Sequence, residues 1–115
     1  MSRKAEVTLH CWDGEYNFRL RITELITLQE KCDAGPAFIG NRLATNEWKV
    51  QDIRETLRLG LIGAGTKQDD ALKLITEHVD NVPLADNVGN AYLVILAAVV
   101  GADDEPVGEQ QAAGA

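Results

Sequence analysis

This 115-residue chain begins with two segments in which apolar and polar side chains alternate. The pattern predicts a ribbon whose apolar face the remaining residues must cover. Residues 6–22, EVTLHCWDGEYNFRLRI, alternate apolar and polar side chains on both sides of Asp13-Gly14. This dipeptide favours a two-residue hairpin turn, because both residues readily take positive φ angles. One face of the predicted ribbon is apolar and must be covered by another part of the chain.

The residues after the ribbon are predicted to be helical, because apolar side chains recur at steps of three and four. We expect a short helix capped by Thr23 and ended by Gly35-Pro36, then another before Thr45-Asn46. Longer helices are expected from about residue 50, from 67 to 80 and from about 83. The side chains expected to face inward are Leu25, Ile26, Leu28, Cys32, Phe38, Ile39, Leu43, Val50, Ile53, Leu57, Leu61, Ala64, Ala71, Leu72, Ile75, Val79, Leu84, Val88, Ala91, Ile95 and Val99.

The predicted class is therefore α+β, with an N-terminal β-hairpin packed on a bundle of about four to five α-helices. Residues 1–101 are expected to form a single domain. Residues 102–115 are acidic and then rich in Gln, Ala and Gly, with too little apolar surface to offset the entropy of ordering. They predict a disordered tail. On the helix from residue 50, we expect Gln51, Asp52, Glu55 and Arg58 to lie largely on the solvent side.

The stretch GLIGAGTK, residues 60–67, raises the question of a phosphate-binding loop. Such a loop follows a strand, whereas residues 52–62 have helical periodicity. The glycine spacing G-x-x-G-x-G matches neither the dinucleotide fingerprint nor the P-loop. We interpret the stretch as a joint between two helices, with Gly63 or Gly65 in a left-handed conformation, Thr66 as the next cap and Asp69 in capping-box position. Gly60 would let another element approach closely.

Charge and composition exclude several classes of function. The net charge of −7 argues against a binder of the nucleic-acid backbone, which needs clustered positive charge. Cys11 and Cys32 show no disulfide framework, and with His10 and His78 they lack the spacing of a metal site. The start, MSRKAEV, has no apolar segment typical of a signal peptide, and no apolar run is long enough to span a bilayer. We expect a cytoplasmic protein without a membrane segment, cofactor or metal.

A small metal-dependent hydrolase using Asp69, Asp70 and His78 is a remote alternative. Adjacent helical positions point about 100° apart, so the two carboxylates more simply serve the positive end of the helix dipole. No nucleophile elbow or zinc-binding helix motif is present. We therefore expect no catalytic residues and no enzyme activity.

With nucleic-acid binding, metal sites and catalysis set aside, binding of a protein partner is the remaining kind of function. Trp12 at the hairpin turn and Trp48 before a helix are large side chains of the type that anchors interfaces, although each could instead pack on its neighbours. Tyr16 of the ribbon and Leu84 and Val88 of the last helix complete the candidate partner-binding set. Strand addition or helix-in-groove packing would use these surfaces.

Three segments, by their sequences and their order along the chain, carry a resemblance to a known family. They are EVTLHCWDGEYNFRLRITELITLQEKCDAG, WKVQDIRETLRLGLIGAG and VPLADNVGNAYLVILAAVVG. The chain resembles the gene transfer agent gp10-like family, which is grouped with phage tail assembly chaperones. The resemblance spans most of residues 6–101 and brings no catalytic motif.

The resemblance implies a non-enzymatic tail assembly chaperone that binds the tape-measure protein, the tail-tube protein or both in the bacterial cytoplasm. Such a chaperone would not remain in the finished particle. A longer form made by frameshifting could extend the chain from Asp103 onward. The alternative is a structural tail component, such as a tube or connector subunit. A homo-oligomer is compatible with both.

Overall fold

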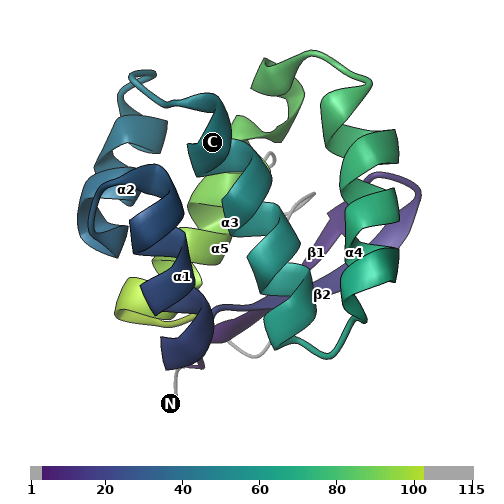
Figure 1. The fold of residues 1–115 in the computed structure, drawn as a ribbon, viewed down its shortest axis with the longest axis horizontal. Coiled ribbons are helices and arrows are strands. Elements are labelled where there is room, and N and C mark those ends of the chain that lie inside the picture. The colour runs from purple at the N-terminus through teal and green to yellow at the C-terminus, as the bar shows by residue number, and fades with distance from the viewer. Residues whose placement is uncertain (1–3, 103–115) are drawn as a thin grey trace.

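The computed structural model describes residues 4–102, in which a single β-hairpin is combined with five α-helices (Figure 1). A π-helical segment, η1, extends the fourth helix, and a 3-10 helix, η2, precedes the fifth. The predicted α+β arrangement is confirmed. In chain order the elements are β1 Glu6–Cys11, β2 Gly14–Arg19, α1 Ile22–Cys32, α2 Pro36–Ala44, α3 Val50–Gly63, α4 Gln68–Ile75, η1 Thr76–Asp80, η2 Leu84–Asn87 and α5 Val88–Val100.

Helix α3 is the central element of the domain. It packs against β2, α1, α4 and α5, and α5 also covers β1 and α2. Figure 1 shows α1 and α2 on one side of α3, with α4 and the tip of the hairpin on the other. The apolar face of the ribbon is thus covered by α3 and α5, as its alternating pattern requires.

The hairpin turn differs from the one predicted. Cys11 pairs with Gly14, so the two turn residues are Trp12 and Asp13, and the positive φ of 57° belongs to Trp12. Gly14 is a strand residue without a positive φ. A bulky residue rarely has a positive φ, which indicates that contacts of the Trp12 ring hold the turn in this form.

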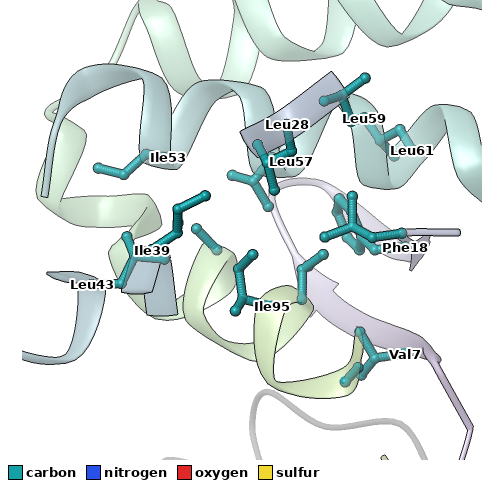
Figure 2. Close-up of a cluster of buried hydrophobic side chains, with 14 of the residues drawn as sticks. Val7, Phe18, Leu28, Ile39, Leu43, Ile53, Leu57, Leu59, Leu61 and Ile95 are labelled. Carbon is teal, nitrogen blue, oxygen red and sulfur yellow. The ribbon is translucent and has the colours of Figure 1, made fainter. Parts of the chain in front are cut away.

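The core draws on the hairpin and on every α-helix, as Figure 2 shows for part of it. Val7, Leu9 and Phe18 are buried from the ribbon, and the predicted 3.6-residue spacing buries Ile53, Leu57 and Leu61 of α3. Several predicted inward residues are instead exposed. Ile26, Phe38 and Leu72 lie on the shorter helices, which cover the core with only a narrow face, whereas Val50 and Val99 lie at the ends of α3 and α5.

The second strand ends earlier than its alternation predicts. Ile22 is the first residue of α1 and is 72% exposed. The helix is capped by Arg21 and not by Thr23, because Glu24 Oε1 accepts hydrogen bonds from the Arg21 amide at 2.9 Å and its Nε at 2.8 Å. The hydrogen bond from the Arg21 guanidinium lowers the pKa of Glu24. At the next boundary, Gly35 and Pro36 begin α2 where they were expected only to end α1.

Two acids predicted to face solvent on α3 are buried. Asp52 is fully buried and accepts hydrogen bonds from Arg42 Nε at 2.9 Å, Arg42 Nη2 at 2.6 Å and the Lys49 amide at 2.8 Å. Glu55 is bound by Arg58 Nη2 at 2.6 Å. A buried carboxylate requires such partners. Arg58 lies on α3 with Glu55, but Arg42 comes from α2, so the pattern of α3 alone could not reveal the partner of Asp52.

Two glycines of α3 allow β2 to lie close to the helix. A Cβ on Gly60 would lie 3.2 Å from both Phe18 of β2 and Val94 of α5. A Cβ on Gly63 would lie 1.8 Å from the Arg19 carbonyl oxygen, which no side chain can tolerate. The close approach expected at Gly60 is present, and the absence of a side chain is required even more strictly at Gly63.

The ends of the described residues lie side by side. Lys4 and Ala102 form a β-bridge with hydrogen bonds of 2.9 Å and 2.7 Å between their amides and carbonyl oxygens. The remainder of the predicted tail, 103–115, lies outside the described residues, so the division at residue 101 stays a prediction. Within residues 4–102, none of the helices has both the length and the apolar character needed to cross a bilayer.

Replacing Gly63 by Ala should lower the free energy of unfolding by about 3 kcal/mol, because the new methyl group meets the Arg19 backbone. Gly89→Ala is the matched control, since a Cβ at this helical position meets nothing within 4 Å. The control should be neutral or up to about 1 kcal/mol more stable. Urea unfolding measures both, and equal stabilities of the two variants would contradict the close approach of β2 to α3.

Replacing Arg42 by Ala should cost about 3–5 kcal/mol, because it leaves the Asp52 carboxylate buried without its main partner. Arg54→Ala is the control, since Arg54 and Asp80 are each about one-third exposed and Glu55 keeps Arg58. The control should cost at most about 1 kcal/mol. Thermal or urea unfolding measures the stability of both variants. Equal stabilities would contradict the buried ion pair between Arg42 and Asp52.

Candidate partner-binding site

Trp12 lies in an aromatic cluster at the tip of the hairpin. Its ring centroid is 5.1 Å from that of Tyr16 and 5.7 Å from that of Phe18, the second pair in edge-to-face geometry. The register pairs Leu9 with Tyr16 and Val7 with Phe18, so these aromatic residues share the covered face of the ribbon. Trp12 therefore turns back onto its own hairpin and is half-buried.

The Trp12 ring also stacks on His78 of η1, with centroids 5.0 Å apart and an interplanar angle of 5°. Trp12 Nε1 donates a hydrogen bond of 2.8 Å to Asn87 Oδ1, and Asn87 Nδ2 donates one of 2.8 Å to the His78 carbonyl. Asn87 is buried and also accepts a bond from Asn90. Trp12 thus links the hairpin to η1 and η2, which lie at least 64 residues later in the sequence.

A hollow of about 480 Å³ lies beside this cluster. His78 Nε2 is buried without a hydrogen bond, 3.4 Å from Glu77 and 3.8 Å from Asp13. Burial, with a smaller contribution from Asp13, raises the pKa of Cys11 to about 12, so its thiol is protonated at neutral pH and is a poor nucleophile. The hollow is lined by His10, Cys11, Trp12, Asp13, His78, Val82, Asp86, Asn87 and Asn90.

The residues of the hydrolase alternative do not converge. Asp69 and Asp70 are exposed in the first turn of α4, where they lie at the positive end of the helix dipole. His78 lies about two turns further on and is stacked on Trp12. Across residues 4–102, no three His, Cys, Asp or Glu side chains are grouped so that they could hold a metal ion.

The glycine stretch forms the expected joint between helices α3 and α4. The amides of Ala64, Gly65 and Thr66 donate to carbonyl oxygens of Gly60, Ile62 and Leu61 at 3.1, 3.0 and 2.9 Å. Gly65 has the left-handed φ of 113°. These three amides are therefore engaged by α3 and do not form an anion-binding loop. The next cap is Lys67, not Thr66, and it has no side-chain hydrogen bond.

The structure brings only part of the predicted partner-binding set together. Trp12 and Tyr16 are in contact, and Asn87 connects them to the segment that contains Leu84 and Val88. Both of these residues pack half-buried against the core. Trp48 also packs against the core, but it lies in the connection between α2 and α3. Figure 1 shows this connection at the upper left, away from the hairpin turn at the right.

A surface that the sequence analysis missed is the groove between α2 and α5, with a volume of about 250 Å³. The residues of its walls recur at steps of three and four on each helix, a spacing that can be recognised in the sequence. It was missed because Ile95 and Val99 were both assigned to the core, whereas Val99 is 48% exposed. The groove is lined by Ala37, Gly40, Asn41, Ala44, Tyr92, Ile95, Leu96 and Val99.

The contacts of Trp12 predict that this residue stabilises the folded domain. Trp12→Ala should cost about 3 kcal/mol because it removes the stack on His78 and the bond to Asn87 together. Tyr16→Phe is the control, because it deletes only the exposed hydrogen bond from the Tyr16 hydroxyl to Asp13. Urea unfolding of both variants is the measurement. If Trp12→Ala cost no more than Tyr16→Phe, the ring would be free to bind a partner instead.

The chain matches a known protein family. Residues 4–101 match the family model described as "Phage tail tube protein, GTA-gp10". No curated protein and no solved structure matches the chain. The match extends over nearly all of the residues that the structure describes and therefore includes both the hairpin and all five α-helices. The chain belongs to the GTA-gp10 phage tail tube protein family.

Proposed function

We propose that this protein is a structural subunit of a phage-type or gene transfer agent tail, where it binds other tail proteins as part of the tube. The observation that carries the proposal is the family match over residues 4–101, whose description names the tail tube. This favours the structural role over the assembly-chaperone role that the sequence resemblance implied. Neither role requires catalysis or a cofactor.

The surface of the domain supports a role in protein–protein contact. Large apolar side chains are exposed on all five α-helices, and those of α1, α2 and α4 lie on both sides of α3 (Figure 1). A subunit in a tube must offer different surfaces to successive neighbours, because a repeated contact that is not two-fold joins unlike patches. The exposed apolar residues are Ile22, Ile26, Phe38, Val50, Leu72, Val99 and Val100.

An assembly chaperone for the tape-measure or tube protein is the second candidate. The observation that favours it is the pair Ile22 and Ile26, which lie one turn apart on α1 and are 72% and 49% exposed. An apolar pair with this spacing can pack against a helix of a client protein. A chaperone would act in the bacterial cytoplasm and be absent from the finished tail.

Quantitative mass spectrometry of purified particles separates the two candidates. A tube subunit should be present at a copy number comparable to that of the other repeated tail proteins. As a control, the same measurement on the unassembled fraction of the lysate should detect the chain in both cases.

A chain found in the lysate in complex with tape-measure or tube protein but missing from particles would contradict the structural role and support the chaperone. A chain found in neither complex nor particle would contradict both. Deleting its reading frame should in either case leave heads without complete tails, visible by electron microscopy.

A further inference from the structure

We infer that the bond between Asp13 and Gly14 is a site of spontaneous covalent modification, at which the aspartate converts to isoaspartate in water. We also infer that the Tyr16 hydroxyl restrains this conversion in the folded protein. The dipeptide is not needed for the geometry of the turn, because Gly14 is a strand residue without a positive φ. Asp13 is the only aspartate in the sequence that precedes a glycine, and no asparagine does.

The conversion is an internal displacement followed by hydrolysis. The Gly14 amide nitrogen attacks Cγ of Asp13, and the new C–N bond closes a succinimide ring. The C–O bond breaks, and the hydroxyl group leaves as water together with the amide proton. Water then adds to the ring carbonyl that belonged to the main chain, and the C–N bond at this carbon breaks. The main chain now runs through Cγ, the former carbonyl carbon is a free carboxylate, and the mass is unchanged.

Both reacting groups are accessible in the structure. The Asp13 side chain is 66% exposed, and Gly14 is exposed as well. A Cβ on Gly14 would meet nothing within 4 Å, so the space beside the attacking nitrogen is open. Gly14 pairs with Cys11 at the end of the ladder next to the turn, where local opening costs least. Opening of this pair frees the amide for attack.

Tyr16 opposes the reaction through its hydroxyl, which donates a hydrogen bond to Asp13 Oδ1. This bond is the main cause that lowers the pKa of Asp13. The same bond raises the pKa of Tyr16 to about 12, so the hydroxyl stays protonated and donates throughout the neutral range. The amide attacks the neutral carboxyl group, because a carboxylate would have to expel an oxide ion. A lowered pKa of Asp13 therefore slows the reaction near neutral pH.

Isoaspartate disturbs the joint that Trp12 makes with the rest of the domain. It lengthens the main chain by one carbon atom in a turn of two residues, so the closing pair of the ladder cannot keep its register. Trp12 then loses the backbone position from which it stacks on His78 and donates to Asn87. The Tyr16 hydroxyl thus protects the link between the hairpin and the segments η1 and η2.

The test ages the full chain and two variants below their unfolding transitions, at about pH 6 and about pH 8. Tyr16→Phe removes the hydrogen bond and keeps the ring. Gly14→Ala adds a methyl group beside the attacking nitrogen, and the position accepts it because φ is not positive and the space is open. Circular dichroism verifies that both variants fold.

Isoaspartate methyltransferase labels the product, and peptide mapping locates the label. Trypsin releases residues 5–19, in which Asp13 is the only aspartate. Isomerisation of Asp13 leaves the mass of this peptide unchanged, whereas deamidation of Asn17 in the same peptide alters it. Label in a peptide of unchanged mass therefore reports on Asp13 alone.

We expect label at Asp13 in the wild type, several times faster labelling in Tyr16→Phe, and a large reduction in Gly14→Ala. Labelling should be slower at about pH 8 than at about pH 6, because less of the carboxyl group is neutral. In urea, unfolded wild type and Tyr16→Phe should react at equal rates, since the restraint belongs to the folded state. The urea midpoint of the aged wild type should fall as label accumulates.

Absence of label at Asp13 in Tyr16→Phe would overturn the inference, as would equal labelling of other aspartates such as Asp33. Equal rates in folded wild type and Tyr16→Phe would contradict the restraint, and so would a faster rate of this variant in urea. A midpoint that stays constant as label accumulates would contradict the effect on the Trp12 joint. These outcomes are independent of the proposed function, which the content of purified particles decides.

Discussion

The close packing of β2 on α3 is the contact on which the domain depends. A two-stranded ribbon is at best marginally stable alone, so its apolar face needs a helix that lies near enough to bury it. Gly60 and Gly63 provide this approach, because neither presents a side chain to the strand. Phe18 then enters the core completely. Since α3 also contacts α1, α4 and α5, the position of the ribbon is coupled to nearly every other element.

Polar contacts fix the ends of this arrangement. Asp52 joins the start of α3 to Arg42 of α2, and it also accepts from the Lys49 amide at the helix cap. At the opposite side, Trp12 and Asn87 join the hairpin turn to η2. In both places a buried polar group has a partner in another element, which gives each joint a defined geometry. Trp12 thus has a structural explanation, and an apolar groove lies elsewhere, between α2 and α5.

Much of the fold was predictable because local chemistry and global packing agree. Alternation identified the hairpin, and the spacing of Ile53, Leu57 and Leu61 identified α3. The turn was assigned to Asp13-Gly14 because that dipeptide is the better turn former, but pairing of the strands placed Trp12 at the positive φ. The candidate site was less predictable. Val99, which lines the α2–α5 groove, has the spacing of a core residue, and only the positions of neighbouring helices leave it exposed.

The sequence by itself determined the class of fold, the order of its elements and the joint at residues 60–67, because periodicity and turn chemistry act over a few residues. The tertiary structure alone decided that Asp52 and Glu55 are buried, that Gly63 must remain glycine, and that a groove lies open between α2 and α5. Each of these facts depends on a second segment distant in sequence. Burial and complementarity are properties of pairs of surfaces, and a periodic pattern describes only one of the two.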